Sequence, residues 1–145
     1  MEMLKRENVQ ILASVRDWKE AIEKSIEPLI AGGYATPDYI AGVIANTEEL
    51  GPYYVLAEDI ALIHARPEQG ALQNQLAVTV VREPVHFAED GTKDARVLVA
   101  LSAVDGEAHI GVMQKLAEIF VDPAKITAIA EASNEDAIYA IFEKA

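Results

Sequence analysis

The chain has 145 residues, no cysteine, and 24 Asp and Glu against 12 Lys and Arg, which gives a formal net charge of −12. The missing thiols exclude disulfides, thiolate zinc sites, iron–sulfur clusters and cysteine nucleophiles. The acidic balance argues against nucleic acid and anionic membranes as partners, because binding to both depends on a dense basic surface.

About half of the residues are apolar (51%), so we expect one hydrophobic core and a single domain over residues 1–145. The N-terminal stretch Met1–Asn8 has no apolar signal region. The apolar runs are far shorter than the roughly 20 residues of a membrane helix. We therefore expect a cytoplasmic protein.

The first part of the chain predicts two helices. Residues 4–13 are expected to form a strand or a loose lead-in, and Ser14 is the expected N-cap of a helix that ends at Gly32–Gly33. The apolar positions of that helix recur at helical spacing and are Trp18, Ile22, Ile26 and Leu29. Thr36–Pro37 predicts the start of a second helix, with Thr36 as its cap, and Gly51–Pro52 predicts its end.

The middle of the chain favours strands, and the last third returns to helices. Strand-like segments lie at 53–56, 60–63, 76–81 and 97–104, with a turn at 89–92. Helices are expected after three caps, which are Asp105, Asp122 and Ser133. This order predicts an α/β (α+β) fold in which helices cover one sheet.

His64 stands out among the three histidines, His64, His86 and His109. A short apolar strand leads to it, and a turn that contains Pro67 and Gly70 follows, with Arg66 two residues on. Neutral imidazole is a nucleophile near pH 7 because its reference pKa is about 6.5, and guanidinium is a planar donor to phosphate oxygens. The residues alone leave two alternatives open, a structural histidine and a solvated arginine.

The segments 51–56 and 60–70 resemble the active-site region of enzyme IIA proteins of the mannitol–fructose superfamily, which belong to the bacterial phosphoenolpyruvate-dependent phosphotransferase system. In that family a histidine followed by Ala-Arg or Gly-Arg carries the phosphoryl group, and it corresponds to His64. The Gly-Pro-Tyr-Tyr and Ala-Arg-Pro-Glu stretches are most similar to those of ascorbate-type members.

The resemblance implies a central mixed sheet with helices on both faces, and a phosphocarrier without metal or cofactor. It implies that His64 accepts phosphoryl from HPr and passes it to a cysteine of an enzyme IIB. His109 matches a second histidine that orients the reacting ring or stabilises the phosphoryl group, and Arg66 is expected to bind phosphate or the partner. His86 has no counterpart and is expected to be structural or exposed. The oligomeric state stays open, with a homodimer as one option.

The sequence departs from the family pattern in three places. Ile63 stands where proline often precedes the histidine, Glu58–Asp59 replaces a small pair, and Thr47–Glu49 replaces a stretch that carries an arginine in mannitol-type members. We expect the acidic side chains Glu58, Asp59 and Glu68 to face solvent. Tyr53, Leu62 and Ile63 are candidates for an apolar docking rim, although Leu62 and Ile63 fit a core better.

Three other interpretations remain open at this stage. The chain could be a regulatory, nitrogen-type relative, an interaction domain in which His64 is inert, or a metal hydrolase.

Overall fold

The structure is a computed structural model that describes residues 4–144, apart from the side chains of residues 106–109. Its elements in chain order are β1 (Leu4–Leu12), α1 (Trp18–Ala31), α2 (Asp38–Leu50), β2 (Asp59–Ile63), the 3₁₀ turn η1 (Pro67–Gln69), β3 (Gln75–His86), β4 (Asp94–Ser102), α3 (Gly106–Phe120), α4 (Pro123–Ala130) and α5 (Glu135–Glu143).

The four strands form one mixed sheet in the order β1-β3-β4-β2. The central pair β3 and β4 is antiparallel, and each is flanked by a parallel partner. The register shift on β3 between Val80 and Val85 includes Pro84, which has no N–H to donate to a ladder. Because β2 runs parallel to β4, with Ile63 opposite Ala100, both strands end at the same edge of the sheet.

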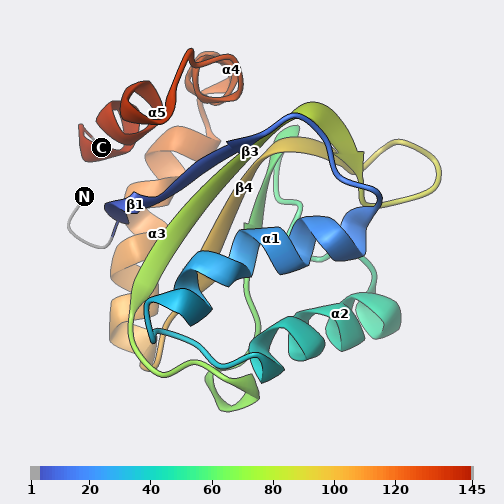
Figure 1. Ribbon diagram of the computed structural model, residues 1–145, viewed down its shortest axis with the longest axis vertical. Coiled ribbons are helices and arrows are strands. Elements are labelled where there is room, and N and C mark those ends of the chain that lie inside the picture. Colours follow the sequence, from blue (N-terminus) through green and yellow to red (C-terminus); the bar gives the residue numbers. More distant parts are fainter. Residues whose placement is uncertain (1–3, 145) are drawn as a thin grey trace.

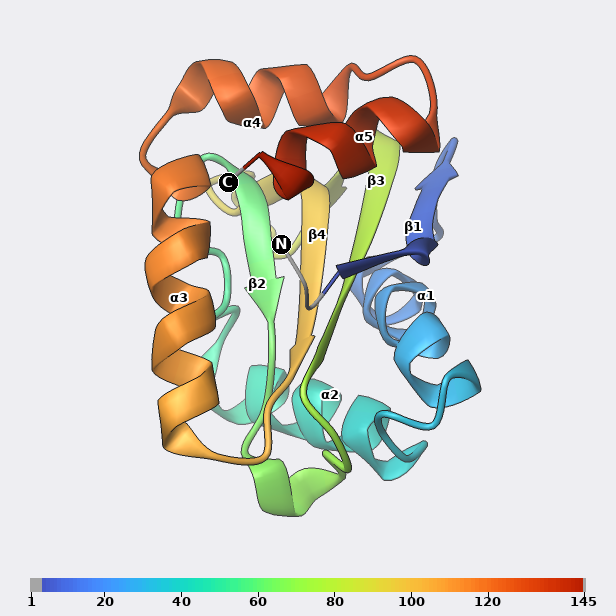
Figure 2. The same ribbon diagram turned by 90° about the vertical axis from the view of Figure 1, so that its left-hand side faces the viewer.

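Helices cover both faces of the sheet, as the sequence predicts (Figures 1 and 2). Alternating side chains divide the strands between two cores. On one face Leu62, Val78 and Val99 pack under α3, α4 and α5, and on the other face Ile63 and Leu98 pack under α1 and α2. Helix α2 therefore lies beside the edge at which β2 and β4 end.

Several predicted helix caps are wrong by one to a few residues. The cap of α1 is Asp17, not Ser14, because the Asp17 carboxylate accepts from the Glu20 N–H at 2.9 Å. The cap of α5 is Asn134, not Ser133, and it accepts from the Ala137 N–H at 2.9 Å. Asp122 caps α4 as predicted.

Thr36 does not cap α2 with its side chain. Its N–H donates to the Gly70 carbonyl at 2.9 Å, and Pro37 occupies the cap position with a helical φ of −55°. This contact joins the start of α2 to the turn that follows β2.

Residues 53–56 form a turn and not the predicted strand. Gly51 ends α2 with a φ of 79°, and the Tyr53 N–H then donates to the Gly51 carbonyl at 2.8 Å. Tyr54 is buried, and its ring meets that of Tyr53 edge-on at 4.9 Å. Aromatic residues that resemble a strand in the sequence therefore fill the core from a turn.

None of the described helices combines the length and the apolar character that crossing a membrane requires.

Gly70→Ala should destabilise the protein by more than about 3 kcal/mol. Gly70 has a φ of 142°, and an added Cβ would lie 2.6 Å from Thr36 Oγ1 and 2.8 Å from the Tyr39 nitrogen. Gly91→Ala is the matched control, because Gly91 has a φ of 74° and open space around it; it should cost only about 1 kcal/mol. Urea unfolding measures the stability of both variants. An equal loss of stability in Gly70→Ala and Gly91→Ala would show that the contact between Gly70 and α2 is not tight.

Candidate functional site

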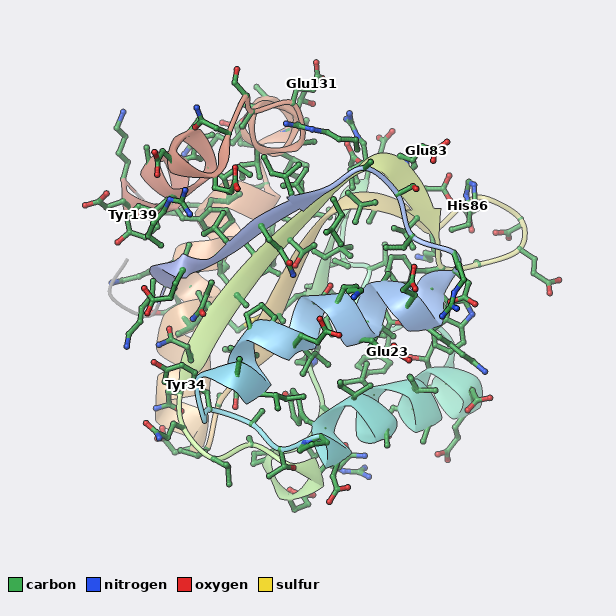
Figure 3. The ribbon with its side chains drawn as sticks, viewed as in Figure 1. Glu23, Tyr34, Glu83, His86, Glu131 and Tyr139 are labelled. Atoms are coloured by element: carbon green, nitrogen blue, oxygen red, sulfur yellow. The ribbon has the colours of Figure 1, made fainter. Side chains whose placement is uncertain are left out.

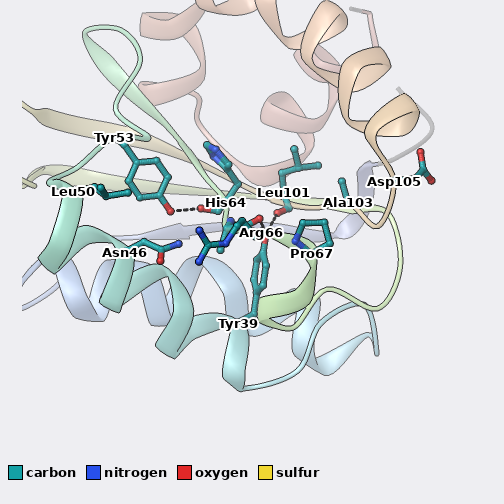
Figure 4. Close-up of a pocket in the computed structure, with 11 residues that line it drawn as sticks. Tyr39, Asn46, Leu50, Tyr53, His64, Arg66, Pro67, Leu101, Ala103 and Asp105 are labelled. Carbon is teal, nitrogen blue, oxygen red and sulfur yellow. Dashed lines mark hydrogen bonds between the residues drawn. The ribbon is translucent and has the colours of Figure 1, made fainter.

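His64 lies directly after β2, at the edge where β2 and β4 end. Its side chain is half-buried and lines a pocket of about 430 Å³ (Figure 4). The pocket is formed by α2, the turn after it, the segment after β2 and the end of β4, through Tyr39, Asn46, Leu50, Tyr53, His64, Ala65, Arg66, Pro67, Leu101, Ala103 and Asp105.

A hydrogen bond to the backbone sets the tautomer of the His64 ring. Nδ1 lies 2.6 Å from the carbonyl oxygen of Leu62. A carbonyl only accepts, so Nδ1 carries the proton and donates it. In the neutral ring the lone pair is then on Nε2. The ring of Tyr53 meets the His64 ring edge-on, with centroids 5.4 Å apart.

Two tyrosine hydroxyls hold the backbone beside His64. The Tyr53 hydroxyl donates to the His64 carbonyl. The Tyr39 hydroxyl accepts from the Ala65 N–H at 3.0 Å and donates to the Leu101 carbonyl at 2.7 Å. Tyr39 is buried, and burial raises its pKa to about 12. It therefore ties the segment after β2 to the end of β4.

The turn η1 is fastened to α2 by a pair of amide side chains. Asn46 Nδ2 donates to Gln69 Oε1 at 2.9 Å, and Gln69 Nε2 returns a bond to Asn46 Oδ1 at 3.2 Å. Gln69 Oε1 also accepts from the Arg66 N–H at 3.0 Å. Gly42 leaves room for this contact, since a Cβ there would lie 3.0 Å from Gln69 Cβ.

Arg66 lines the pocket with a largely exposed side chain. Its Nε lies 3.4 Å from the Glu68 carboxylate, and both side chains are 70% exposed. Such a pair constrains the guanidinium weakly. Figure 4 shows the guanidinium on the α2 side of the pocket, whereas the His64 ring points to the opposite side. Burial raises the pKa of Tyr53, and Asn46 and the charge of Arg66 oppose that rise.

The other two histidines differ in what can be said of them. His109 belongs to the first turn of α3, which starts four residues after β4 ends, but its side chain lies outside the described residues. His86 is exposed, as predicted, and its Nδ1 lies 2.7 Å from Asp94. It is the last residue of β3 (Figure 3) and pairs with Asp94 at the start of β4, whereas His64 lies at the edge where β4 ends.

Leu62 and Ile63 belong to the core, the alternative that the sequence favours, whereas one of the acidic side chains expected to face solvent does not. Leu62 and Ile63 are fully buried, and only Tyr53 of the rim candidates lines the pocket. Glu58 is exposed as predicted. Asp59 instead forms a two-pronged ion pair with Arg96, with Oδ2 2.5 Å from Nη2 and 2.9 Å from Nε.

Sequence reasoning missed the polar residues of α2 that shape the pocket. Tyr39 and Asn46 are seven residues apart on one helix, and Leu50 follows four residues later, 67% exposed. This spacing places all three on one face of α2. The signal that could have identified Tyr39 is its hydroxyl, which needs a hydrogen-bond partner when the side chain is buried.

Comparison with known proteins gives a consistent result. Residues 2–145 match the family model described as "Phosphoenolpyruvate-dependent sugar phosphotransferase system, EIIA 2". SgcA of Escherichia coli K12, which carries a provisional assignment as a phosphotransferase IIA component, is 42% identical over 92% of this chain and 93% of its own.

Two further relatives from Escherichia coli K12 differ in the substrate for which they are named. The mannitol-specific cryptic phosphotransferase enzyme IIA component is 34% identical over 88% of this chain and 86% of its own. The ascorbate-specific EIIA component is 27% identical over 83% of this chain and 79% of its own.

Solved structures agree in fold. The solution structure of the Escherichia coli mannitol-specific cryptic enzyme IIA CmtB has a TM-score of 0.92 at 31% identity, over 99% of this chain and 97% of that one. The IIA of the Escherichia coli mannitol system was solved in complex with phosphorylated IIB. It has a TM-score of 0.84 at 27% identity, over 98% of this chain and 99% of that one.

The Tyr39 hydroxyl should make stability depend on alkaline pH. Its pKa is raised in the folded protein, so its stabilising contribution is complete below pH 10 and is lost as pH rises towards 12. Between pH 8 and pH 11, the free energy of unfolding of the wild type should fall by about 1 kcal/mol more than that of Tyr39→Phe. Urea unfolding at several pH values measures this difference, and parallel curves for the two proteins would contradict it.

Proposed function

Because this chain belongs to the enzyme IIA type 2 family of the phosphoenolpyruvate-dependent sugar phosphotransferase system, we propose that it carries phosphate on Nε2 of His64. The phosphoryl group comes from the phosphohistidine of HPr and goes to a cysteine of an enzyme IIB. The observation that carries the proposal is the bond from His64 Nδ1 to the Leu62 carbonyl, which leaves the lone pair on Nε2.

The first transfer is a displacement at phosphorus. The Nε2 lone pair forms the new N–P bond while the N–P bond of HPr breaks and its electron pair returns to the donor imidazole. Nδ1 keeps its proton, so positive charge develops on the His64 ring. The Leu62 carbonyl, 2.6 Å from Nδ1, stabilises that charge because a hydrogen bond to a charged group is stronger than a neutral one.

The second transfer reverses the role of His64. A thiolate of enzyme IIB attacks the phosphorus, and the electron pair of the Nε2–P bond returns to the His64 ring. The described chain has no cysteine, so the thiol belongs to a partner. A related IIA was solved in complex with phosphorylated IIB, and this supports enzyme IIB as the acceptor.

Arg66 is proposed to bind the partner at the pocket mouth. It is 70% exposed and held only by a solvent-exposed pair with Glu68, so a partner carboxylate or a phosphoryl oxygen can replace Glu68 at little cost. Its guanidinium lies on the α2 side of the pocket, and this position favours contact with the partner over contact with the ring.

The transported substrate depends on the partners, because IIA components contact proteins and not the sugar. We propose ascorbate, on the resemblance of residues 51–54 and 65–68 to ascorbate-type members. Mannitol is the alternative, since a mannitol-specific relative is 34% identical. Transfer rates from the phosphorylated chain to an ascorbate-type and a mannitol-type IIB distinguish the two.

His64→Ala should abolish phosphorylation by phosphoenolpyruvate, enzyme I and HPr, as measured by intact mass. His86→Ala is the matched control: it removes the same side chain from the opposite end of the sheet, and it should take up one phosphoryl group like the wild type. Phosphohistidine analysis of the wild type should give the Nε2 isomer. A full phosphoryl group on His64→Ala, or the Nδ1 isomer, would remove the proposal.

His109→Ala should slow transfer from phospho-HPr by roughly tenfold to a hundredfold, because its proposed role is to orient the His64 ring or to stabilise the phosphoryl oxygens. Rapid-quench kinetics measure the rate. The end point of phosphorylation should stay at one group per chain. A wild-type rate would make His109 a structural residue.

A further inference from the structure

The tyrosines Tyr39 and Tyr53 contact the two ends of a single peptide group. The Tyr53 hydroxyl donates to the His64 carbonyl, and the Ala65 N–H donates to the Tyr39 hydroxyl at 3.0 Å. These two polar groups belong to the same peptide plane, the one between His64 and Ala65. Both of its hydrogen-bonding groups are therefore occupied by side chains and not by a strand neighbour.

We propose that Tyr39 and Tyr53 are positioning residues for phosphoryl transfer, which act by fixing the orientation of the His64–Ala65 peptide. The proposal rests on the proposed function of His64. It extends that function by assigning a role to two hydroxyls, neither of which needs to touch the phosphoryl group.

The need for such a clamp follows from where His64 lies. β2 ends at Ile63, so the strand ladder no longer orients the backbone at the reacting residue. A peptide with free rotation would swing the Cα–Cβ bond of His64, and with it Nε2. Reacting atoms must meet in line within a few tenths of an ångström, and a misplacement of about 1 Å can cost a hundredfold in rate.

The two tyrosines reach the peptide from a rigid base. Tyr39 lies in the first turn of α2, and Tyr53 follows Gly51 at its end. The Tyr39 hydroxyl also donates to the Leu101 carbonyl at 2.7 Å. The clamp therefore connects the His64 segment with the end of β4, the strand that leads to α3 and His109.

The ring of His64 has an anchor besides the two hydroxyls. Its Nδ1 bonds to the Leu62 carbonyl, and the Leu62 N–H donates to the Tyr54 carbonyl at 2.8 Å. One set of contacts thus fixes the rotation of the ring, and the two hydroxyls fix the backbone that carries it.

The Tyr39→Phe variant can distinguish a positioning role from direct contact with a partner protein. The Tyr39 side chain is only 1% exposed, so neither HPr nor enzyme IIB can touch it. An effect of Tyr39→Phe on transfer must pass through the groups that its hydroxyl binds, the Ala65 N–H and the Leu101 carbonyl.

The test compares Tyr39→Phe and Tyr53→Phe with Tyr54→Phe. Each variant keeps the ring and removes one hydroxyl. Tyr54 is an apt control because it is fully buried in the same core, and its hydroxyl is bonded to Thr47 at 3.0 Å and not to the His64 segment. The wild-type tautomer and ring position of His64 are recorded first, from long-range ¹H–¹⁵N spectra.

Tyr39→Phe and Tyr53→Phe should each lower kcat for transfer from phospho-HPr by about tenfold, with KM for phospho-HPr unchanged in Tyr39→Phe. In Tyr39→Phe the Ala65 amide should also exchange with solvent about tenfold faster. Tyr54→Phe should be destabilised to a similar degree and transfer at the wild-type rate.

Two results would overturn the clamp. One is Tyr39→Phe that transfers at the wild-type rate although the Ala65 amide has lost protection. The other is Tyr54→Phe that is slowed as much as Tyr39→Phe, because the effect would then be a general softening of the core. A wild-type protein that HPr does not phosphorylate would defeat the proposed function. The clamp would then be judged by amide exchange alone, and an unchanged exchange rate of the Ala65 amide in Tyr39→Phe would reject it.

Discussion

A hydrogen bond between the His64 ring and the carbonyl of Leu62 links the proposed chemistry of this protein to its fold. The bond spans only two residues, with 2.6 Å between Nδ1 and the oxygen, but it needs the Leu62 carbonyl to point at the ring. That carbonyl is held because Leu62 is fully buried in β2 and pairs with Val99 of β4. Strand pairing in the sheet therefore helps to determine which ring nitrogen of His64 carries the proton.

Helix α2 and the turn after it supply one side of the pocket around His64, although α2 carries no cationic side chain. Its first turn provides Tyr39, its middle provides Asn46, and the turn after it provides Tyr53. At Thr47–Glu49, where the resemblance to mannitol-type members implies an arginine, this helix has none, and Glu48 lies 3.9 Å from Lys19 of α1. The α2 side chains that line the pocket are thus uncharged, and Arg66 is the cation of the pocket among the described residues.

Much of the fold could be predicted from the sequence, because the strands and helices have clear periodicities. The strands at 60–63 and 76–81 and the helix ends at Gly32 and Gly51 follow from burial and backbone freedom, which are local properties. The turn at 53–56 was misread because Tyr and Val favour strands, whereas tertiary packing of Tyr54 decided its conformation. For the site, a motif identified His64 and Arg66, but the role of Tyr39 depends on contacts with Ala65 and Leu101, far away in sequence. Periodicity carries no information about such contacts.

Asp59 and Arg96 form one structural unit at the start of β2. Asp59 adopts a φ of 73°, a conformation in which glycine is the least strained residue, and its carboxylate holds the half-buried Arg96 through the side chain and the backbone N–H. Glycine at this position would relax the backbone but leave a guanidinium without its counter-charge. Among homologues, a small residue at position 59 should therefore be accompanied by the loss of arginine at position 96, and aspartate by its retention. The pair fixes the start of β2, the strand that leads to His64.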